Sequence, residues 1–196
     1  MAWILLRPSN YKQVAPLVRT GGSRHTGLAA LPHRNIHTKE NVLYNEPNEN
    51  WIGGSYTDPE TGDTYTGWDS LFWFWEDMYD MVVQVYEDNG VASKPRFAGL
   101  NLTAYSNDIM ERYISFCVEH NCMPDVITWH DLSTWQFNAF DAEYNHYRSL
   151  EEKYLTEENA EKYGVDIAPR EIVINEYAAQ AECASPGDLV RWIGLF

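Results

Sequence analysis

The sequence predicts an α/β fold in which strands and helices alternate and the strands run parallel. Four short apolar stretches have the composition of buried strands, and each is followed by a longer stretch with apolar residues at three-to-four spacing. Polar side chains stand at the end of all four short stretches. Such alternation calls for parallel strands joined by right-handed crossovers, and it excludes an all-α or an all-β fold.

The first predicted strand covers 42–44. It is followed by Asn45, Glu46 and Pro47, and a proline cannot continue the hydrogen-bonded ladder of a strand. We therefore expect Glu46 to stand at the carboxyl end of this strand, where a carboxylate can meet a ligand. The stretch 51–68 is rich in Gly, Thr, Asp and Pro, which predicts a long surface loop.

A helix is predicted over 69–89, with apolar residues on one side and acidic or amide residues on the other. Gly90 supplies a stop signal directly after it. The apolar stripe must pack on a sheet. It consists of Leu71, Phe72, Trp75, Met78, Tyr79, Val82, Val83 and Tyr86.

Three further strand-and-helix units follow. Their predicted strands cover 96–102, 125–130 and 172–175. Predicted helix starts lie at Asn107 or Asp108, near Phe137, near Thr156 and at Ser185-Pro186-Gly187-Asp188. Most of these starts carry side chains that can accept hydrogen bonds from the free N–H groups of a first helical turn.

Two architectures accept four such units, an open doubly wound sheet and a (β/α)8 barrel. A doubly wound sheet usually carries a phosphate-binding glycine motif in its first turn, and neither G-x-G-x-x-G nor G-x-x-x-x-G-K occurs. A barrel instead assembles its site from polar side chains at successive strand ends. The strand ends carry Asn45 and Glu46, Asn101 and Thr103, His130 and Asp131, and Asn175 and Glu176. The predicted fold is therefore a TIM barrel, incomplete because the 196 residues fall short of the ~250 of a typical one.

The composition limits the kinds of partner. A formal net charge of -15 and a pI near 4.6 argue against nucleic acid, whose phosphate backbone requires clustered Lys and Arg. Eight Trp and thirteen Tyr suit a site for sugars or other polar rings, although most of these rings are expected in the core. We expect a soluble chain with no membrane partner, because no apolar run approaches ~18 residues. No signal peptide is readable, so the location is not predicted.

A shift in charge divides the chain at residue 40. Residues 1–40 hold six of the fourteen Lys and Arg and one acidic residue, whereas 41–196 hold eight basic and 28 acidic residues. The first segment also lacks a sustained helical or strand period. We therefore predict a poorly ordered basic segment over 1–40 and a catalytic domain over 41–196, the partial barrel.

At its strand ends the sequence resembles clan A of the glycoside hydrolases, and most closely family 39, whose members include β-xylosidases. The Asn-Glu-Pro-Asn segment at 45–48 is similar to the family's fourth-strand motif, in which the glutamate is the catalytic acid/base. The Ile-Asn-Glu-Tyr segment at 174–177 is similar to the seventh-strand motif, whose glutamate is the nucleophile. Stretches 97–117 and 125–130 resemble the fifth strand with its helix and the sixth strand. The resemblance covers about 41–196 and implies strands four to seven of the barrel with their helices.

Chemistry and resemblance together predict the roles of five residues. Cleaving a glycosidic bond requires protonation of a poor leaving group while a second group attacks the anomeric carbon, and two carboxyl groups can do both. Glu46 is expected to act as acid and then base, and Glu176 as the ionised nucleophile of a retaining reaction. Asn45 is expected to hold the sugar's 2-hydroxyl, His130 to hydrogen-bond Glu176 or a sugar hydroxyl, and Trp129 to stack on a sugar face. The mechanism needs neither metal nor organic cofactor.

Alternatives stay open at this point. The chain is either a retaining glycosidase, or the catalytic half of one, that cleaves β-glycosidic bonds of xyloside or glucoside type, or it is a truncated, non-catalytic barrel fragment that only binds carbohydrate or assembles with another chain. An open fragment exposes sheet edges, so self-association or a missing remainder of the barrel is expected. His130 has a structural alternative as a local partner, and Trp51 and Trp135 also follow strand ends.

Overall fold

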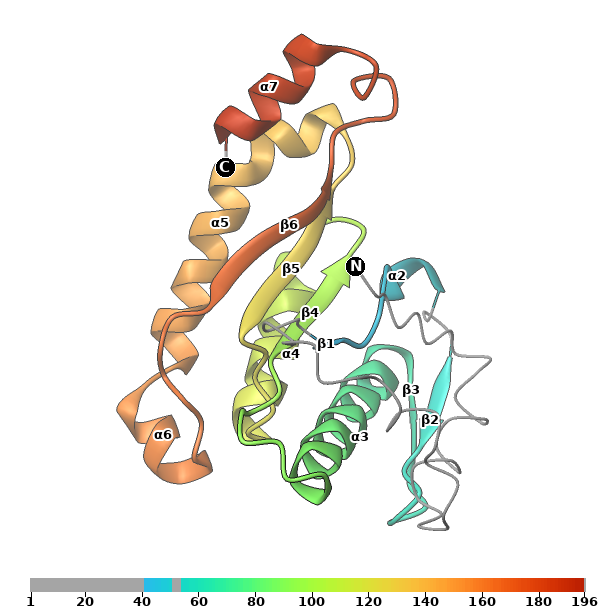
Figure 1. Ribbon diagram of the computed structural model, residues 1–196, viewed down its shortest axis with the longest axis vertical. Helices are drawn as coiled ribbons and strands as arrows, with labels where there is room; N and C mark the ends of the chain where they lie inside the picture. The colour runs from blue at the N-terminus through green and yellow to red at the C-terminus, as the bar shows by residue number, and fades with distance from the viewer. Residues whose placement is uncertain (1–40, 51–53, 196) are drawn as a thin grey trace.

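A single parallel sheet of four strands organises the structure, a computed structural model that describes residues 41–50 and 54–195 (Figure 1). The strands are β1 (Asn41–Val42), β4 (Phe97–Leu102), β5 (Val126–Asp131) and β6 (Glu171–Tyr177). Strands and helices alternate along the chain as the sequence predicts. The predicted basic segment 1–40 lies outside the described residues, as does Trp51.

Six helices lie in the described part of the chain, and two of them begin at a side chain that caps the first turn. They are α2 (Pro47–Asn50), α3 (Gly67–Asp88), α4 (Asn107–Glu119), α5 (Thr134–Tyr154), α6 (Glu157–Tyr163) and α7 (Pro186–Leu195). The Thr156 hydroxyl oxygen accepts the N–H of Asn159 at 3.2 Å, and Gly164 ends α6 in the left-handed conformation with a φ of 79°. The residue at the N-cap of α4 is Ser106, one position before the start that the sequence indicated. None of the described helices is long and apolar enough to cross a membrane.

The strand order β1-β4-β5-β6 decides how the sheet is wound. All pairings are parallel, and each strand pairs with the next one of this sheet along the chain. Right-handed crossovers that always advance in one direction place their helices on the same face of the sheet. A doubly wound sheet reverses direction, and this sheet does not. The arrangement is a mixed α/β fold that is compatible with part of an α/β barrel.

A β-hairpin stands where the sequence predicts a long surface loop over 51–68. β2 (Ser55–Thr57) pairs antiparallel with β3 (Thr64–Thr66), and the buried Tyr56 packs on Phe74 of α3. Asp58 closes the connection, because its Oδ1 accepts the N–H of Glu60 at 2.7 Å. The turn residues are those that indicated a loop, but each strand carries only one large side chain, so the strands themselves gave no periodic signal. The prediction of a loop is wrong for these six residues.

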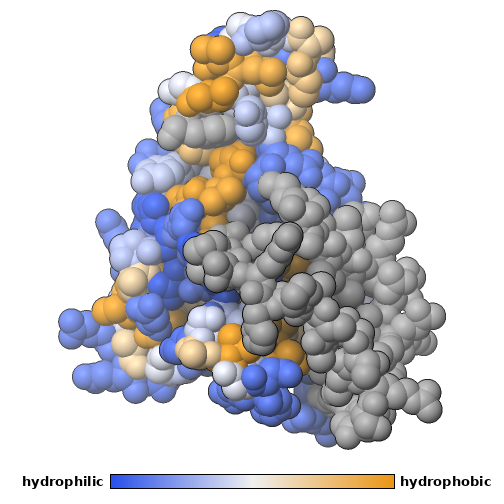
Figure 2. Space-filling view, viewed as in Figure 1, coloured by the Kyte–Doolittle hydropathy of each residue, from blue (hydrophilic) through white to orange (hydrophobic). Residues whose placement is uncertain are grey.

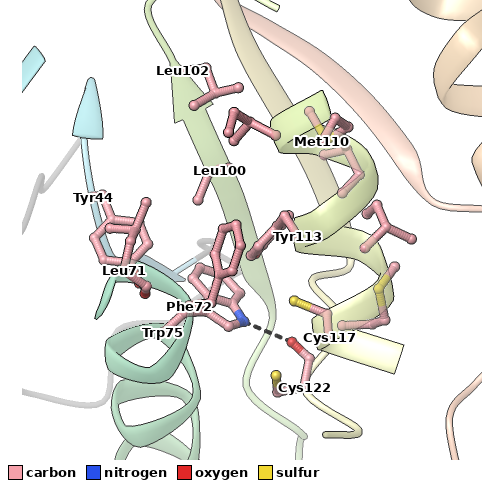
Figure 3. Packing of buried hydrophobic residues seen from close by; sticks show 14 of the residues in the cluster. Tyr44, Leu71, Phe72, Trp75, Leu100, Leu102, Met110, Tyr113, Cys117 and Cys122 are labelled. Atoms are coloured by element: carbon pink, nitrogen blue, oxygen red, sulfur yellow. Dashed lines mark hydrogen bonds between the residues drawn. The ribbon is translucent and has the colours of Figure 1, made fainter. Parts of the chain in front are cut away.

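Aromatic side chains join the sheet to α3 and α4 in the core (Figure 3). The fully buried indole of Trp75 donates its N–H to the backbone carbonyl of Cys122 at 2.8 Å and meets the Tyr113 ring edge-on at 5.5 Å between centroids. Gly99 of β4 permits this approach, since a Cβ there would lie 2.8 Å from the Trp75 ring. Cys117 and Cys122 are buried in the same layer. The strands that carry the site residues pack against this layer of side chains.

Strand β6 is less covered than the strands beside it. All side chains of β4 and β5 are buried, whereas those of β6 are half-buried or exposed. Among the described strands only β5 pairs with β6, so its other edge is unpaired within the described part of the chain. Apolar side chains also gather over α7, where Val190 and Ile193 are exposed (Figure 2).

Candidate active site

Three predicted site residues meet at the carboxyl end of the sheet. Nδ1 of His130 lies 3.2 Å from Oε1 of Glu46 and 3.9 Å from Oε2 of Glu176. One oxygen of each glutamate and one ring nitrogen all lie within 4.8 Å of one another. The imidazole is fully buried, while the Glu46 and Glu176 side chains are 27% and 47% exposed. The two carboxylates therefore face solvent, with the histidine behind them.

A β-bulge brings Glu176 to His130. Along the pair of strands β5 and β6, Trp129 is opposite Ile174, but His130 is opposite Glu176, so Asn175 is an extra residue. In a regular strand Ile174 and Glu176 would share a face, because side chains alternate. Their partners Trp129 and His130 are consecutive and point to opposite faces. The extra residue therefore turns Glu176 onto the face of His130.

Glu46 is held by its backbone as well as by its side chain. Its φ of 50° is uncommon for a residue other than glycine, and its N–H donates to the carbonyl of Asn101 at 2.9 Å. Pro47 then begins α2, which ends the extended segment as the sequence predicts. Backbone conformations of this kind persist where the surrounding structure fixes them, and they cluster at functional sites.

Asn101 lies at the centre of the hydrogen bonds beneath the two glutamates. It is fully buried, and its Nδ2 donates to the carbonyl of Tyr44 at 2.7 Å. Its Oδ1 accepts the Thr128 hydroxyl and also Nδ2 of Asn175, the latter at 3.0 Å. These contacts connect the segment after β1 with β4, β5 and β6 in one network.

Gln136 supports the same strand end, although no sequence pattern indicated it. Its side chain is buried, and its Nε2 donates to the backbone carbonyl of His130 at 2.9 Å. The Ser133 hydroxyl donates to Gln136 Oε1 at 2.6 Å and so orients the amide. Gln136 comes at the start of a helix, where a single amide among apolar and polar residues has no distinguishing pattern.

The two remaining predicted site residues have different surroundings. Asn45 is half-buried beside Glu46, and its contact with a sugar stays a prediction. The stacking role predicted for Trp129 is corrected by the structure. This residue lies inside β5, is fully buried and meets the Tyr105 ring edge-on at 5.0 Å between centroids. Strand β5 extends to Asp131, so Trp129 is not beyond the strand end and its ring has no face open to a sugar.

Glu46, His130 and Glu176 are also the described residues whose spacing fits a metal ion. Carboxylate and imidazole are ligands that zinc accepts. The hydrogen bond between His130 and Glu46 already gives these two groups a partner. We assign no ion to the three side chains, and the chemistry below needs none.

A second pair of carboxyl groups is buried between β5 and α5. Asp131 is fully buried and Glu143 nearly so. Burial, and then the neighbouring Glu143, raises the pKa of Asp131 from 3.8 to about 7. Burial also raises the pKa of Glu143 to about 6. This pair is not part of the group formed by Glu46, His130 and Glu176.

Replacing Asp131 by asparagine is expected to stabilise the protein at pH 8. Between pH 3.8 and about 7 this carboxyl stays protonated in the folded protein but ionises on unfolding, so the free energy of unfolding falls as the pH rises across this range. The stabilisation is complete below the unfolded pKa of 3.8 and is lost once the pH has risen through about 7. The variant removes this loss, which we put at roughly 1 to 3 kcal/mol at pH 8, and gains less at pH 5. Urea unfolding at the two pH values measures the difference. Glu152→Gln, at an exposed position of α5, is the control, and an equal response of both variants would contradict the prediction.

Comparison with known proteins points to sugar chemistry, although no family model matches the chain. The chain is 24% identical over 159 residues to a 3-O-beta-L-arabinopyranosyl-alpha-L-arabinofuranosidase of Bifidobacterium pseudocatenulatum, covering 72% of the chain and 15% of that protein. It is 26% identical over 178 residues to a 3-O-alpha-D-galactosyl-alpha-L-arabinofuranosidase of Bifidobacterium longum subsp. longum, covering 83% of the chain and 14% of that protein. The chain thus spans about one seventh of the length of these relatives. Its distant, partial relatives are glycosidases.

A solved structure bears on the fold alone. The structure of N2152 from Neocallimastix frontalis matches 91% of this chain and 34% of its own length, with a TM-score of 0.53 and 21% identity. The likeness agrees with a mixed α/β arrangement around a parallel sheet. The chain therefore corresponds to about one third of that structure.

Proposed function

We propose that this chain carries the two catalytic carboxylates of a retaining glycoside hydrolase of the family 39 type, on part of a (β/α)8 barrel. The observation that carries the proposal is the approach of Glu46 and Glu176, with one oxygen of each within 4.8 Å of the other. Retaining glycosidases place their two carboxyl groups ~5 to 5.5 Å apart, whereas inverting enzymes need ~6.5 to 9.5 Å. The distant relationship to arabinofuranosidases supports the same class of reaction.

In the first step, a carboxylate oxygen of Glu176 attacks the anomeric carbon while the glycosidic C–O bond breaks. Glu46 gives its proton to the departing oxygen, so the leaving group departs as an alcohol. In the second step, Glu46 takes a proton from water, whose oxygen attacks the same carbon and releases Glu176. Two displacements at one carbon return the original configuration.

His130 serves both steps by holding the glutamates. Its Nδ1 contacts Glu46 at 3.2 Å and lies 3.9 Å from Glu176, and its burial keeps the ring in place. As a donor, this nitrogen can stabilise whichever carboxylate is ionised at a given stage. Asn45, next to Glu46, would hold the 2-hydroxyl, a contact that strengthens in the transition state.

The substrate would be a glycoside of a five-carbon sugar or of glucose. β-Xylosides and β-glucosides follow from the sequence motifs, and arabinofuranosides from the names of the relatives. Trp135 takes the place of Trp129 as the aromatic ring for stacking, because it lies at the start of α5 just beyond β5 and is 59% exposed.

A second function is favoured by the partial coverage of the relatives. The chain matches 14% to 15% of their lengths, and within the described part of the chain β6 has an unpaired edge. In this case the chain binds carbohydrate or completes its barrel wall with another chain, and does not turn over substrate by itself. An unpaired strand edge is a template for pairing with a further strand.

Assay of the purified chain on aryl glycosides separates the two functions. The panel contains β-D-xyloside, β-D-glucoside and α-L-arabinofuranoside, and proton NMR identifies the anomer that is released first. We expect turnover of at least one substrate with retention of configuration. Release of the inverted anomer would contradict the mechanism. A folded chain that binds the sugars without releasing the aryl group would favour the second function.

A further inference from the structure

Both register shifts of the parallel sheet occur at asparagines. Between β4 and β5, Leu100 is opposite Thr128 and Leu102 is opposite Trp129, which leaves Asn101 as the extra residue. Between β5 and β6, the extra residue is Asn175. Bulges re-aim the side chains that follow them and are over-represented beside active sites.

The two asparagines bond to each other across β5. Nδ2 of Asn175 donates to Oδ1 of Asn101 at 3.0 Å, and the Thr128 hydroxyl, on the strand between them, donates to the same oxygen. Asn101 is fully buried and has a φ of 55°, a conformation that asparagine tolerates better than most residues. Neither asparagine contacts His130 or the carboxylates through its side chain in any hydrogen bond of the described residues.

Each bulge also adjoins one of the glutamates. The carbonyl of Asn101 accepts the N–H of Glu46 at 2.9 Å, and Asn175 immediately precedes Glu176. A shift of either bulge would therefore move one carboxylate relative to the other. The bond between the two bulges is therefore a second link between the carboxylates, beside the contacts that His130 makes to both.

We infer that Asn101 and Asn175 are positioning residues whose mutual hydrogen bond fixes the relative placement of Glu46 and Glu176. The inference rests on the proposed function, since fixed placement matters for a reaction that needs both carboxylates. Misplacement of a catalytic group by about 1 Å can cost ~100-fold in rate. The asparagines act through the glutamates and do not touch substrate.

The variant Asn101→Gly removes the side chain and keeps a residue that adopts positive φ without strain. Asn121, with a φ of 51° after α4 and far from the site in the fold, allows the matched control Asn121→Gly. Asn175→Ala breaks the same hydrogen bond from the other strand. Hydrogen exchange of the Glu46 amide reports the placement directly, and it is compared with exchange of amides in α3.

For Asn101→Gly and Asn175→Ala we expect the Glu46 amide to exchange at least about tenfold faster relative to α3, with Asn121→Gly unchanged. On any substrate that the wild type hydrolyses, we expect kcat to fall about 100-fold with KM within about twofold. Equal Glu46 exchange in Asn101→Gly and Asn121→Gly overturns the inference, whether or not the wild type has activity. Absence of wild-type hydrolysis counts against the proposed function alone, and the exchange result still decides the positioning role.

Discussion

Glu176→Gln is expected to abolish hydrolysis, with kcat lower by about four to six orders of magnitude, as for the loss of other essential nucleophiles. Glutamine keeps the size of the side chain but offers no carboxylate oxygen to attack the anomeric carbon. The loss should be the same for substrates with good and poor leaving groups, because no glycosyl-enzyme forms with either. Steady-state assay of an aryl glycoside and of an alkyl glycoside of the same sugar measures it.

Glu46→Gln should differ in its dependence on the leaving group. A general acid contributes roughly 10² to 10⁴ to the rate, and it matters most when the departing oxygen is a poor leaving group. The variant should therefore lose alkyl glycoside hydrolysis and keep much of the first step on an activated aryl glycoside. Equal losses on both substrates would contradict the assignment of Glu46 as the acid.

Glu171→Gln is the matched control for both variants. Glu171 begins β6 at the other end from Glu176, is 55% exposed and pairs with Arg96 at the surface. Exposed ion pairs contribute about 0 to 1 kcal/mol, so this variant should keep wild-type activity and nearly wild-type stability. If it lost activity as Glu176→Gln does, the loss in Glu176→Gln would reflect the strand and not the nucleophile.

Trp75→Ala should have the largest effect on stability, a loss of about 3 to 5 kcal/mol. The indole is fully buried between the sheet and α4, and its removal leaves a cavity over Gly99. The carbonyl of Cys122 also loses its donor at 2.8 Å. Urea unfolding followed by far-UV circular dichroism gives the difference in the free energy of unfolding.

Trp135→Ala provides the comparison for this loss. The same substitution is made in an indole that is 59% exposed, so the expected change in stability is within about 0.5 kcal/mol. Similar losses of stability for both tryptophans would mean that the packing of Trp75 against the sheet does not stabilise the fold as its contacts indicate. Should Trp75→Ala fail to accumulate, Trp75→Phe, which keeps most of the ring volume, should show an intermediate loss.

The sequence predicted those elements of the fold that depend on interactions between residues close together in the chain. Apolar spacing predicted that α3 begins at residue 69, and the helix begins two residues earlier, at Gly67. The caps at Thr156 and Ser185 lie where the side chains indicated. The parallel sheet follows from alternation of the elements and is confirmed. Short strands such as β2 have too few residues for a period, which is why the hairpin was missed.

The sequence indicated three of the residues that meet at the candidate site, but not their geometry. Glu46, His130 and Glu176 follow apolar runs, and parallel strands bring their ends to one edge. The bulges are relations of register between strands, and Asn101 and Asn175 are 74 residues apart in the chain, so no local window contains them. The burial of Trp129 depends on rings from other elements, such as that of Tyr105, which pack on β5 and cover it.

The three cysteines provide a way to follow opening of the α3 and α4 layer without any added label. Cys183 is exposed and will react with a thiol reagent at once, whereas Cys117 and Cys122 are buried beside Trp75 (Figure 3). Burial also raises the pKa of the Cys122 thiol, so its reactive thiolate is scarce in the folded state. Mass spectrometry after timed alkylation would thus count one fast and two slow modifications per chain. The rate of the slow alkylation measures how often these helices separate from the sheet, and it can be measured in the presence of a sugar ligand.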